Sequence, residues 1–394
     1  MSDLLARIMA EPVEDVIDQT LTDNGLSFTI KNFVFQVLLE CAITVVPTRD
    51  VMPVLKCFQL TAARSGLRIV ASDMCMHLVA GTPMVTTTKP GTAVFPARKL
   101  LDIIKSAENT DVVITVTGTT ADITIGRASW TLKLPGGDDY PAIPTIDEAA
   151  YINVDKDTFA DAIRRVRYAA SRDANRANLN IISIGGGKLT TSDGARFHQV
   201  AISDFPAALT IPVSAVDDLL RLLRSCDLDT INVGQSDSHL IFRFGGVTFI
   251  VNKFRAQFPD MEAQILRPAL ENKHELNLDR VELVDAIKRI RINADPESSA
   301  IALKLTCNEI TVSTQDKFGN TASQTIDGYW SGPEHTIVVN HRFLTETLNT
   351  YSDITCTFKL GDDTKTRRSP LMLTDKAQGS TAVIQQMMID WITS

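Results

Sequence analysis

The residue types that catalyse reactions are present in this chain, but none occurs in a catalytic spacing. The segment GGGK at 185–188 has the composition of a phosphate-binding loop without its pattern. No glycine stands five residues before Gly187, and Leu189 follows the lysine where that loop needs Ser or Thr. A Gly-rich β-turn is the better interpretation of this segment.

The other candidates for metal or nucleophilic chemistry are isolated. HExxH, GxSxG and clustered Cys/His motifs are absent from the sequence. The six histidines show no metal-ligand spacing: His77, His198, His239, His274, His335 and His341. The acid pairs Asp138-Asp139 and Asp362-Asp363 are typical of solvated turns. We therefore expect a non-catalytic protein with no metal and no cofactor.

The cysteines indicate a reducing compartment. They are scattered and form no CxxC pair: Cys41, Cys57, Cys75, Cys226, Cys307 and Cys356. Six in a chain of 394 residues do not resemble a disulfide framework. No signal peptide is evident, and Gln36 and Glu40 interrupt the longest apolar stretch, Phe33 to Val46. The sequence predicts a cytoplasmic protein with no membrane partner.

The chemistry that remains is the binding of anions by basic residues. The net charge of −8 and the pI near 5.3 argue against this, but a basic stripe can lie on one face of an acidic protein. Basic residues three, four or seven apart share the polar faces of four predicted helices. They are Arg98, Lys99 and Lys105; Arg164, Arg165 and Arg167; Arg221 and Arg224; and Lys288, Arg289 and Arg291.

Two interpretations of these basic faces stay open. Any amphipathic helix carries charged residues on its solvated side, so a single such helix indicates little. Four mostly basic faces in an acidic chain favour a shared surface that attracts phosphates without reading base sequence. Two other helices fit less well, because the first has Gln36 and Glu40 and the last sets Glu346 against His341 and Arg342.

The helices belong to a unit that occurs three times, offset by roughly 120 residues. Each unit opens with an apolar-striped helix, near 32–45, 157–171 and 280–292. A hairpin and a polar-Asp step follow, ending at Asp73, Asp193 and Asp316. A further strand then leads into a second helix: AVFPARKLLDIIKSA, TIPVSAVDDLLRLLRS and TIVVNHRFLTETLNT.

This pattern predicts an α+β fold of three units, each with two helices against antiparallel strands. The expected boundaries are 27–147, 150–266 and 272–394, after an N-terminal extension of residues 1–26. Apolar residues of the extension, beginning with Leu4, Leu5 and Ile8, have helical spacing. A frayed tail and a docked helix both fit that spacing, and we assign the extension no function.

Five segments in order carry a family likeness that runs from about Leu26 to Trp391. They are LSFTIKN at 26–32, TRDVMPVL at 48–55, VFPARKLLDIIK at 94–105, TSDGARF at 191–197 and FPDME at 258–262. With the three-fold repeat, they make the chain resemble the bacterial DNA sliding clamp, the β subunit of DNA polymerase III. The altered pocket and chain end described below leave a phage or plasmid member open beside a chromosomal one.

The resemblance implies a head-to-tail homodimer in which two three-domain chains close a ring, with helices lining the hole and sheets outside. Such a ring would encircle duplex DNA without reading its sequence. It would tether a DNA polymerase and a clamp loader through short linear peptides, without catalysis of its own. The residues implied in DNA contact are Arg49, Arg98, Lys105, Arg164, Arg167, Arg176, Arg221, Arg224, Lys288 and Arg291.

The resemblance also implies a pocket for partner peptides. It maps to Leu179, Ser192, Gly194, Ala195, Arg196, Phe197, Pro259, Leu371 and Met388. An apolar slot with a few polar groups suits a short peptide. The chain departs from the family at Ala177 and Asn178, where paired tyrosines are usual, at Ala195, where a histidine is common, and at its end, QQMMIDWITS. The preferred peptide therefore stays open.

The third implied site is the subunit interface. Lys99, Ile103 and Trp130 match positions that meet the third unit of the other chain near Ile292. Ile103 and Ile292 fit core positions equally well. A peptide-binding hub with weak DNA affinity is a competing hypothesis, because the first helix is nearly neutral and the DNA-contact loop is altered.

Overall fold

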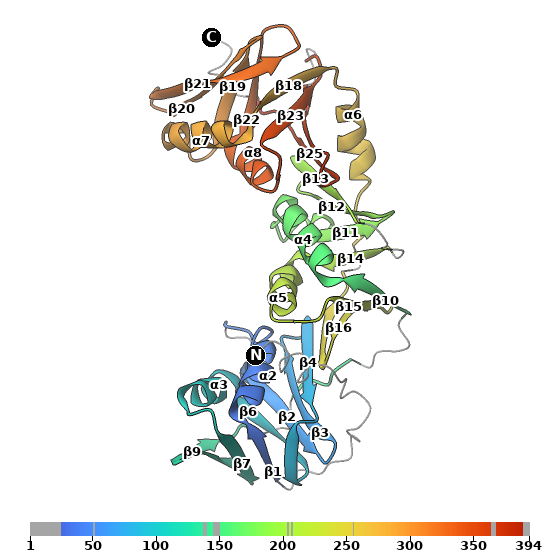
Figure 1. The fold of residues 1–394 in the computed structure, drawn as a ribbon, viewed down its shortest axis with the longest axis vertical. Helices are drawn as coiled ribbons and strands as arrows, with labels where there is room; N and C mark the ends of the chain where they lie inside the picture. The colour runs from blue at the N-terminus through green and yellow to red at the C-terminus, as the bar shows by residue number, and fades with distance from the viewer. Residues whose placement is uncertain are drawn as a thin grey trace. The chain divides into compact units, whose positions relative to one another are not determined.

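The computed structural model describes residues 25–49, 52–136, 140–144, 150–202, 205, 208–254, 256–363 and 368–388 (Figure 1). The chain separates into two compact units, Met1–Ala160 with Ser214–Lys253 and Asp161–Val213 with Phe254–Ser394. No helix in the described part is long and apolar enough to cross a membrane. Almost all of the predicted extension lies outside the described residues.

The first repeat lies in unit 1 and contains two helices and nine strands among its described residues. Their bounds are β1 Leu26–Lys31, α2 Asn32–Ala42, β2 Cys57–Ala63, β3 Gly66–Ser72, β4 Met76–Thr82, β5 Val85–Lys89, β6 Gly91–Pro96, α3 Ala97–Ser106, β7 Asp111–Thr117, β8 Thr120–Ile125 and β9 Ala128–Lys133. The helices α2 and α3 contact each other, α2 also contacts β3 and β4, and α3 contacts β2 and β6. Buried Phe28 of β1 and Phe35 of α2 meet edge to face in this core.

The second repeat follows the same order of elements. Their bounds are β10 Ala150–Asp155, α4 Lys156–Val166, β11 Ile181–Gly185, β12 Lys188–Ser192, β13 Arg196–Ala201, β14 Leu209–Pro212, α5 Val213–Arg224, β15 Thr230–Gln235, β16 His239–Phe244 and β17 Val247–Asn252. The GGGK segment forms the turn between β11 and β12, where Gly186 and Gly187 have φ of 58° and 72°. Glycine reaches this left-handed region without steric cost, so the β-turn interpretation is confirmed.

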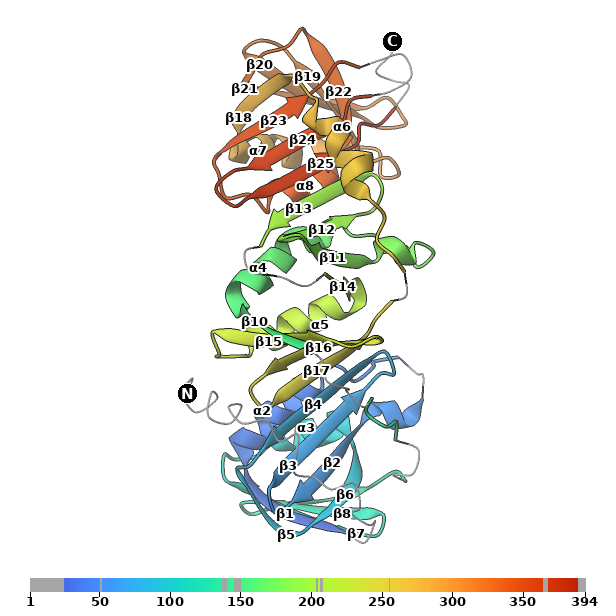
Figure 2. The same cartoon turned by 90° about the vertical axis from the view of Figure 1, so that its right-hand side faces the viewer.

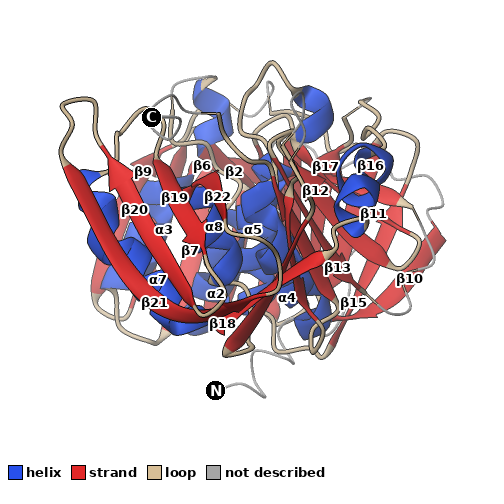
Figure 3. Ribbon diagram, turned by 90° about the horizontal axis from the view of Figure 1, so that it is seen from above, coloured by secondary structure: helices blue, strands red, loops and turns tan. Residues whose placement is uncertain are grey.

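The third repeat lies in unit 2, after a helical connector of a π-helix, Glu262–Leu266, and α6, Arg267–Leu270. Its elements are β18 His274–Asp279, α7 Arg280–Ile290, β19 Ala300–Leu305, β20 Glu309–Gln315, β21 Thr321–Trp330, β22 His335–Asn340, α8 His341–Leu348, β23 Thr355–Leu360, β24 Leu371–Asp375 and β25 Ser380–Ile384. The helices α7 and α8 contact each other, and α7 packs on β20 and β21 (Figure 3). The predicted α+β fold with a three-fold element order is confirmed; the exact unit boundaries stay predictions.

The opening helices are shorter than their apolar stripes predicted. The helix expected over 157–171 ends at Val166 and continues as a 3-10 turn, Arg167–Ala169. Likewise α7 ends at Ile290 before a 3-10 turn, Arg291–Asn293. The stripe itself is buried, with Phe159, Ile163 and Val166 fully inaccessible. The periodicity therefore located the buried face, but a 3-10 turn prolongs nearly the same periodicity past the helix end.

Strand pairing joins consecutive repeats (Figure 2). In unit 1, β4 of the first repeat pairs antiparallel with β17 of the second, with Leu78 opposite Phe249. In unit 2, β13 of the second repeat pairs with β25 of the third, with Phe197 opposite Val383. The sheets therefore run on as β10-β15-β16-β17-β4-β3-β2-β6 and as β14-β11-β12-β13-β25-β24-β23-β18-β21-β20-β19-β22. We call these two junctions the first seam and the second seam.

Two carboxyl groups at the first seam are held where their ionisation is unfavourable. Burial raises the pKa of Asp218, on α5, to about 6. Arg221, whose Nη1 lies 3.4 Å from Asp218 Oδ1, opposes this shift, whereas Asp73 and Asp217 add to it. Burial likewise raises the pKa of Asp73, in the turn before β4. The first seam is therefore expected to weaken when these groups lose their protons.

We expect Asp218→Asn to stabilise the chain above pH 6 and to change little at pH 4. A carboxyl group with a raised folded pKa binds its proton more tightly when folded, so stability falls as pH rises from 3.8, its ordinary pKa, to about 6. The amide avoids this loss, which solvent screening limits to about 1 kcal/mol. Thermal denaturation between pH 4 and pH 7.5 measures the effect, with Asp102→Asn, an exposed position on α3, as control. A gain that does not depend on pH would contradict this account.

Candidate DNA-facing surfaces and partner-peptide pocket

Eight of the ten basic residues predicted to contact DNA lie on helices or on the turns that follow them. Those in unit 1 are exposed: Arg98 and Lys105 on α3, and Arg221 and Arg224 on α5. Those in unit 2 are Arg164 on α4, Arg167 in the following turn, Lys288 on α7 and Arg291 in its following turn. All of these are exposed except Arg167, which is half-buried. Exposure leaves the charges of the others available to an anion.

Several of these cations already have acidic neighbours. Lys105 Nζ lies 2.9 Å from Glu40 Oε1, which joins α3 to α2. Burial alone would raise the pKa of Glu40, but hydrogen bonds from Lys105 and Gln36 outweigh it and lower the pKa. Lys288 Nζ lies 3.0 Å from Asp285 Oδ1 on the same helix. The acid that did not fit the predicted basic face therefore partners its neighbour, and exposed pairs of this kind are worth little energy.

The two predicted loop arginines have different surroundings. Arg49 is exposed in the loop after α2. Arg176 is also exposed, but its Nη1 donates to the backbone oxygen of Asp193 at 2.9 Å and its Nε lies 3.8 Å from Asp173 Oδ2. Arg176 thus forms part of the rim of a pocket in unit 2.

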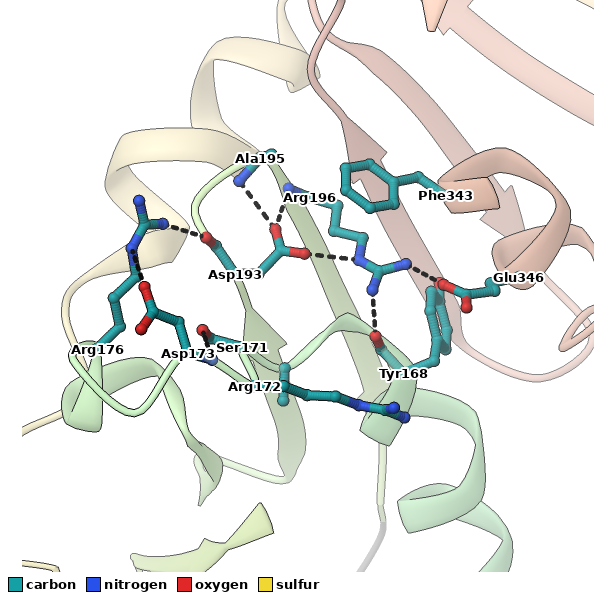
Figure 4. Close-up of a pocket in the computed structure, with 11 residues that line it drawn as sticks. Tyr168, Ser171, Arg172, Asp173, Arg176, Asp193, Ala195, Arg196, Phe343 and Glu346 are labelled. Atoms are coloured by element: carbon teal, nitrogen blue, oxygen red, sulfur yellow. Dashed lines mark hydrogen bonds and ion pairs between the residues drawn. The ribbon is translucent and has the colours of Figure 1, made fainter. Parts of the chain in front are cut away.

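That pocket has a volume of about 450 Å³ and joins the second repeat to α8 of the third. Arg196 lies at its centre with 9% of its surface exposed (Figure 4). Its Nε donates to Asp193 Oδ2 at 2.9 Å, its Nη1 to Glu346 Oε2 and its Nη2 to the Tyr168 carbonyl. Its Cζ lies 4.2 Å from the ring centroid of Phe343 and 5.1 Å from that of Tyr168. One guanidinium therefore links two carboxylates, a carbonyl and two rings.

The tight turn before β13 positions the rest of the pocket. Ser192 Oγ donates to the Arg196 carbonyl at 2.7 Å and accepts from the Gly194 N–H at 3.0 Å. Asp193 Oδ1 accepts from the N–H groups of Ala195 and Arg196, each at 2.9 Å. Gly194 has φ of 91°, which a side chain would strain. Exposed Ala195 presents only a methyl group to the pocket.

The apolar residues predicted for the pocket divide between two clusters. Leu179 and Phe197 belong to one with Met372 and Val383, against which Phe258 packs. Leu371 is instead buried in the core of the third repeat, on the opposite face of β24, so it is not brought together with Leu179. Pro259 is half-buried beside Phe258, and Met388 is 84% exposed. A shift of one residue along a strand reverses the face, so Met372 occupies the place expected for Leu371.

A cluster of buried, uncharged aromatic side chains lies beneath the pocket. His198 is buried with ring centroids 5.3 Å from Tyr168 and 6.2 Å from Tyr351, and its Nε2 lies 2.6 Å from Ser380 Oγ. Burial lowers the pKa of His198 to about 3 and raises the pKa of Tyr168 above its usual range. The Tyr168 hydroxyl donates to Thr347 Oγ1 of α8 at 2.8 Å. These groups therefore keep one protonation state near neutral pH.

Sequence reasoning missed Tyr168, Phe343, Glu346 and Met372. The first three line the pocket, and Met372 packs beneath it. The internal repeat could have indicated Glu346. When α8 and α5 are aligned at their first residues, Glu346 takes the same position as Asp218. In each case the repeat before the helix contains an Asp turn, at Asp73 for Asp218 and at Asp193 for Glu346. The other three are reached only through contacts between residues far apart in sequence.

The predicted interface residues lie on both repeats that a second copy would join. Lys99 is exposed on α3, and Trp130 is half-buried on β9. Ile103 is buried, which agrees with the alternative that it is a core residue. Ile292 is 82% exposed, so it is not a core residue in the described structure. An apolar side chain this exposed is available to a partner.

The comparisons with known proteins agree with this architecture. The family model of the DNA polymerase III beta subunit N-terminal domain matches residues 26–144, and that of its C-terminal domain matches residues 268–388. The beta sliding clamp of Chlamydia muridarum is 24% identical over 288 residues, covering 70% of this chain and 76% of the relative. That of Pseudomonas aeruginosa is 24% identical over 351 residues, covering 86% and 94%.

Solved structures show the same fold. The C. crescentus beta sliding clamp matches with a TM-score of 0.84 and 22% identity over 93% of this chain and 100% of that chain. A sliding clamp from Bartonella birtlesii bound to griselimycin matches with a TM-score of 0.84 and 20% identity over 92% and 100%. The architecture is that of a DNA sliding clamp. With family models matched at both ends, this chain belongs to the DNA polymerase III beta subunit family.

Proposed function

We propose that this chain is a DNA polymerase processivity factor, a homodimeric ring that slides on duplex DNA and performs no catalysis. The observation that carries this proposal is the three-fold element order together with family models matched at both ends of the chain. A processivity factor needs a closed ring and a surface that attracts DNA phosphates, and it needs no reactive group. The exposed basic helix residues supply the second requirement, because they attract phosphates regardless of sequence.

The strand pattern supports a ring closed by a second copy. The strand after each Asp turn pairs with the last strand of the next repeat, as β4 pairs with β17 and β13 with β25. The third such strand, β21, pairs with β20 over Thr321–Asp327 and with β18 only over Gly328–Trp330. The last strand of the first repeat, β9, pairs only with β8 among the described strands. A head-to-tail dimer would pair β21 of one copy with β9 of the other.

The pocket at the second seam is proposed to hold short linear peptides of a DNA polymerase and a clamp loader. Its apolar residues and its rim of Arg172, Arg176 and Asp173 suit a peptide with both apolar and polar side chains. Sliding clamps from Bartonella birtlesii and Pseudomonas aeruginosa have been solved with griselimycin bound, and we propose this compound as the probe of the pocket. The cytoplasm is the proposed compartment.

The proposed dimer is tested by its mass. We expect a solution mass of roughly twice 43.2 kDa and its reduction to the monomer mass by Ile292→Glu, because a buried unpaired carboxylate opposes association. Sedimentation equilibrium over a concentration series measures both. Leu270→Glu is the matched control, since Leu270 is 61% exposed on α6, which is not among the elements of the proposed contact. A wild-type monomer at all concentrations would reject ring closure by two copies.

The proposed DNA-facing residues are tested by salt dependence. We expect replacement of Arg49, Arg224 and Arg291 by Ala to weaken duplex binding for every sequence alike. The slope of log K against log salt should fall by about 1 for each phosphate that the variant no longer neutralises. Fluorescence anisotropy of a labelled duplex from 50 to 200 mM salt measures both quantities.

A matched control removes three exposed positive charges elsewhere, with Arg64, Lys273 and Lys376 replaced by Ala. That variant should keep the wild-type slope, since these residues lie in loops and turns, off the proposed helix faces. Equal weakening in the two variants would show that net charge alone drives binding. No weakening in either variant would favour the competing peptide-binding hub. The ion pairs of Lys105 and Lys288 agree with that hypothesis, because they partly neutralise two of the predicted cations.

A further inference from the structure

Arg196 is bound so fully that little of it remains for a ligand. Its side chain is 10% exposed, and all three guanidinium nitrogens donate within the chain. Asp193 and the Tyr168 carbonyl belong to the second repeat, whereas Glu346 belongs to α8 of the third. The planar fork of a guanidinium can serve several acceptors at fixed angles, which an ammonium group cannot do.

The rings that flank Arg196 also come from both repeats. Phe343 lies on α8, one turn before Glu346, and Tyr168 lies in the 3-10 turn after α4. Both rings line the pocket and both lie within cation–π distance of Arg196. The position of each pocket wall therefore depends on the same buried side chain.

The first seam provides an internal comparison. The turn before β4 repeats the turn before β13: Asp73 accepts from the N–H groups of Cys75 and Met76 as Asp193 does from Ala195 and Arg196. Met74, with φ of 75°, takes the place of Gly194. Met76 thus stands where the second seam has Arg196. Asp73 and Asp218 stand where the second seam has Asp193 and Glu346, but the residue at the Arg196 position is uncharged, and Arg221 of α5 pairs with Asp218 instead.

We infer that Arg196 is a positioning residue that fixes the two walls of the partner-peptide pocket before a ligand arrives. The inference rests on the proposed peptide-binding function of this pocket. Arg196 acts by holding Tyr168 and Phe343 at their distance across the second seam. At the first seam, Met76 stands in the position that Arg196 occupies at the second.

This role makes a kinetic prediction that a direct contact would not make. If a residue only pre-organises a pocket, its removal lowers the fraction of molecules competent to bind, and the apparent affinity falls by that fraction. The association rate constant then decreases while the dissociation rate constant is preserved. Removal of a direct ligand contact acts mainly on the dissociation rate constant instead.

The test uses the full chain, griselimycin as the probe and surface plasmon resonance for both rate constants. The variant Arg196→Met gives the second seam the residue found at the first. We expect association to slow at least tenfold and dissociation to change less than twofold. Glu346→Gln should slow association less, and the double variant should be no slower than Arg196→Met, because both remove one shared interaction.

Arg165→Gln is the matched control, since Arg165 pairs with Asp161 on α4 and does not line the pocket. It should leave both rate constants unchanged. Arg196→Lys should restore part of the association rate by returning the charge without the fork.

Hydrogen exchange of the unliganded chains gives a second readout, in case a variant binds too weakly to measure. Amides of 168–179 and of α8 should exchange faster in Arg196→Met than in wild type, with strands β19 to β22 unchanged. A faster dissociation with unchanged association, or unchanged exchange in both segments, would overturn the inference. Failure of the wild-type chain to bind griselimycin would instead reject the proposed pocket, and the inference with it.

Discussion

Antiparallel pairing across the two seams is the constraint on which the rest of this structure depends. The strands β4 and β13 would each be a sheet edge if their repeats were isolated, with unpaired backbone groups open to any other strand. Pairing with β17 and β25 removes those edges and fixes the register between repeats. Among the described strands, β9 and the first part of β21 each have one edge without a partner, which is why we propose that a second copy completes the pattern.

The seams also explain where the candidate sites lie. The proposed peptide pocket is lined by Arg196 from one repeat and Glu346 from the next, so neither repeat contains it alone. The first seam has acids at the corresponding positions and Met76 in place of the arginine, and burial raises the pKa of Asp218 there. Two junctions with one backbone pattern thus differ in chemistry, most clearly where Met76 stands against Arg196. The proposed DNA-facing residues, by contrast, need only exposed helix positions.

Much of the fold could be predicted because its signals are local. Helical spacing and Asp turns recur in each repeat, and the resulting α+β order is observed. The pocket was harder, since Leu371 and Met372 differ only in which strand face they occupy, and sequence alone does not fix that parity. Glu346 lies 150 positions from Arg196, and no local pattern relates them. Glu40 looked misplaced on a basic face until its contact with Lys105 was known.

Topological retention on DNA tests the central claim most directly. A closed ring holds a circular duplex without tight contacts, whereas a protein bound by charge alone dissociates equally from any duplex as salt rises. The clamp, loaded on a nicked plasmid and passed through a gel-filtration column at high salt, is predicted to co-elute with the circle. Linearising the plasmid should release it. Equal retention on circular and linear DNA, or on neither, would contradict the account.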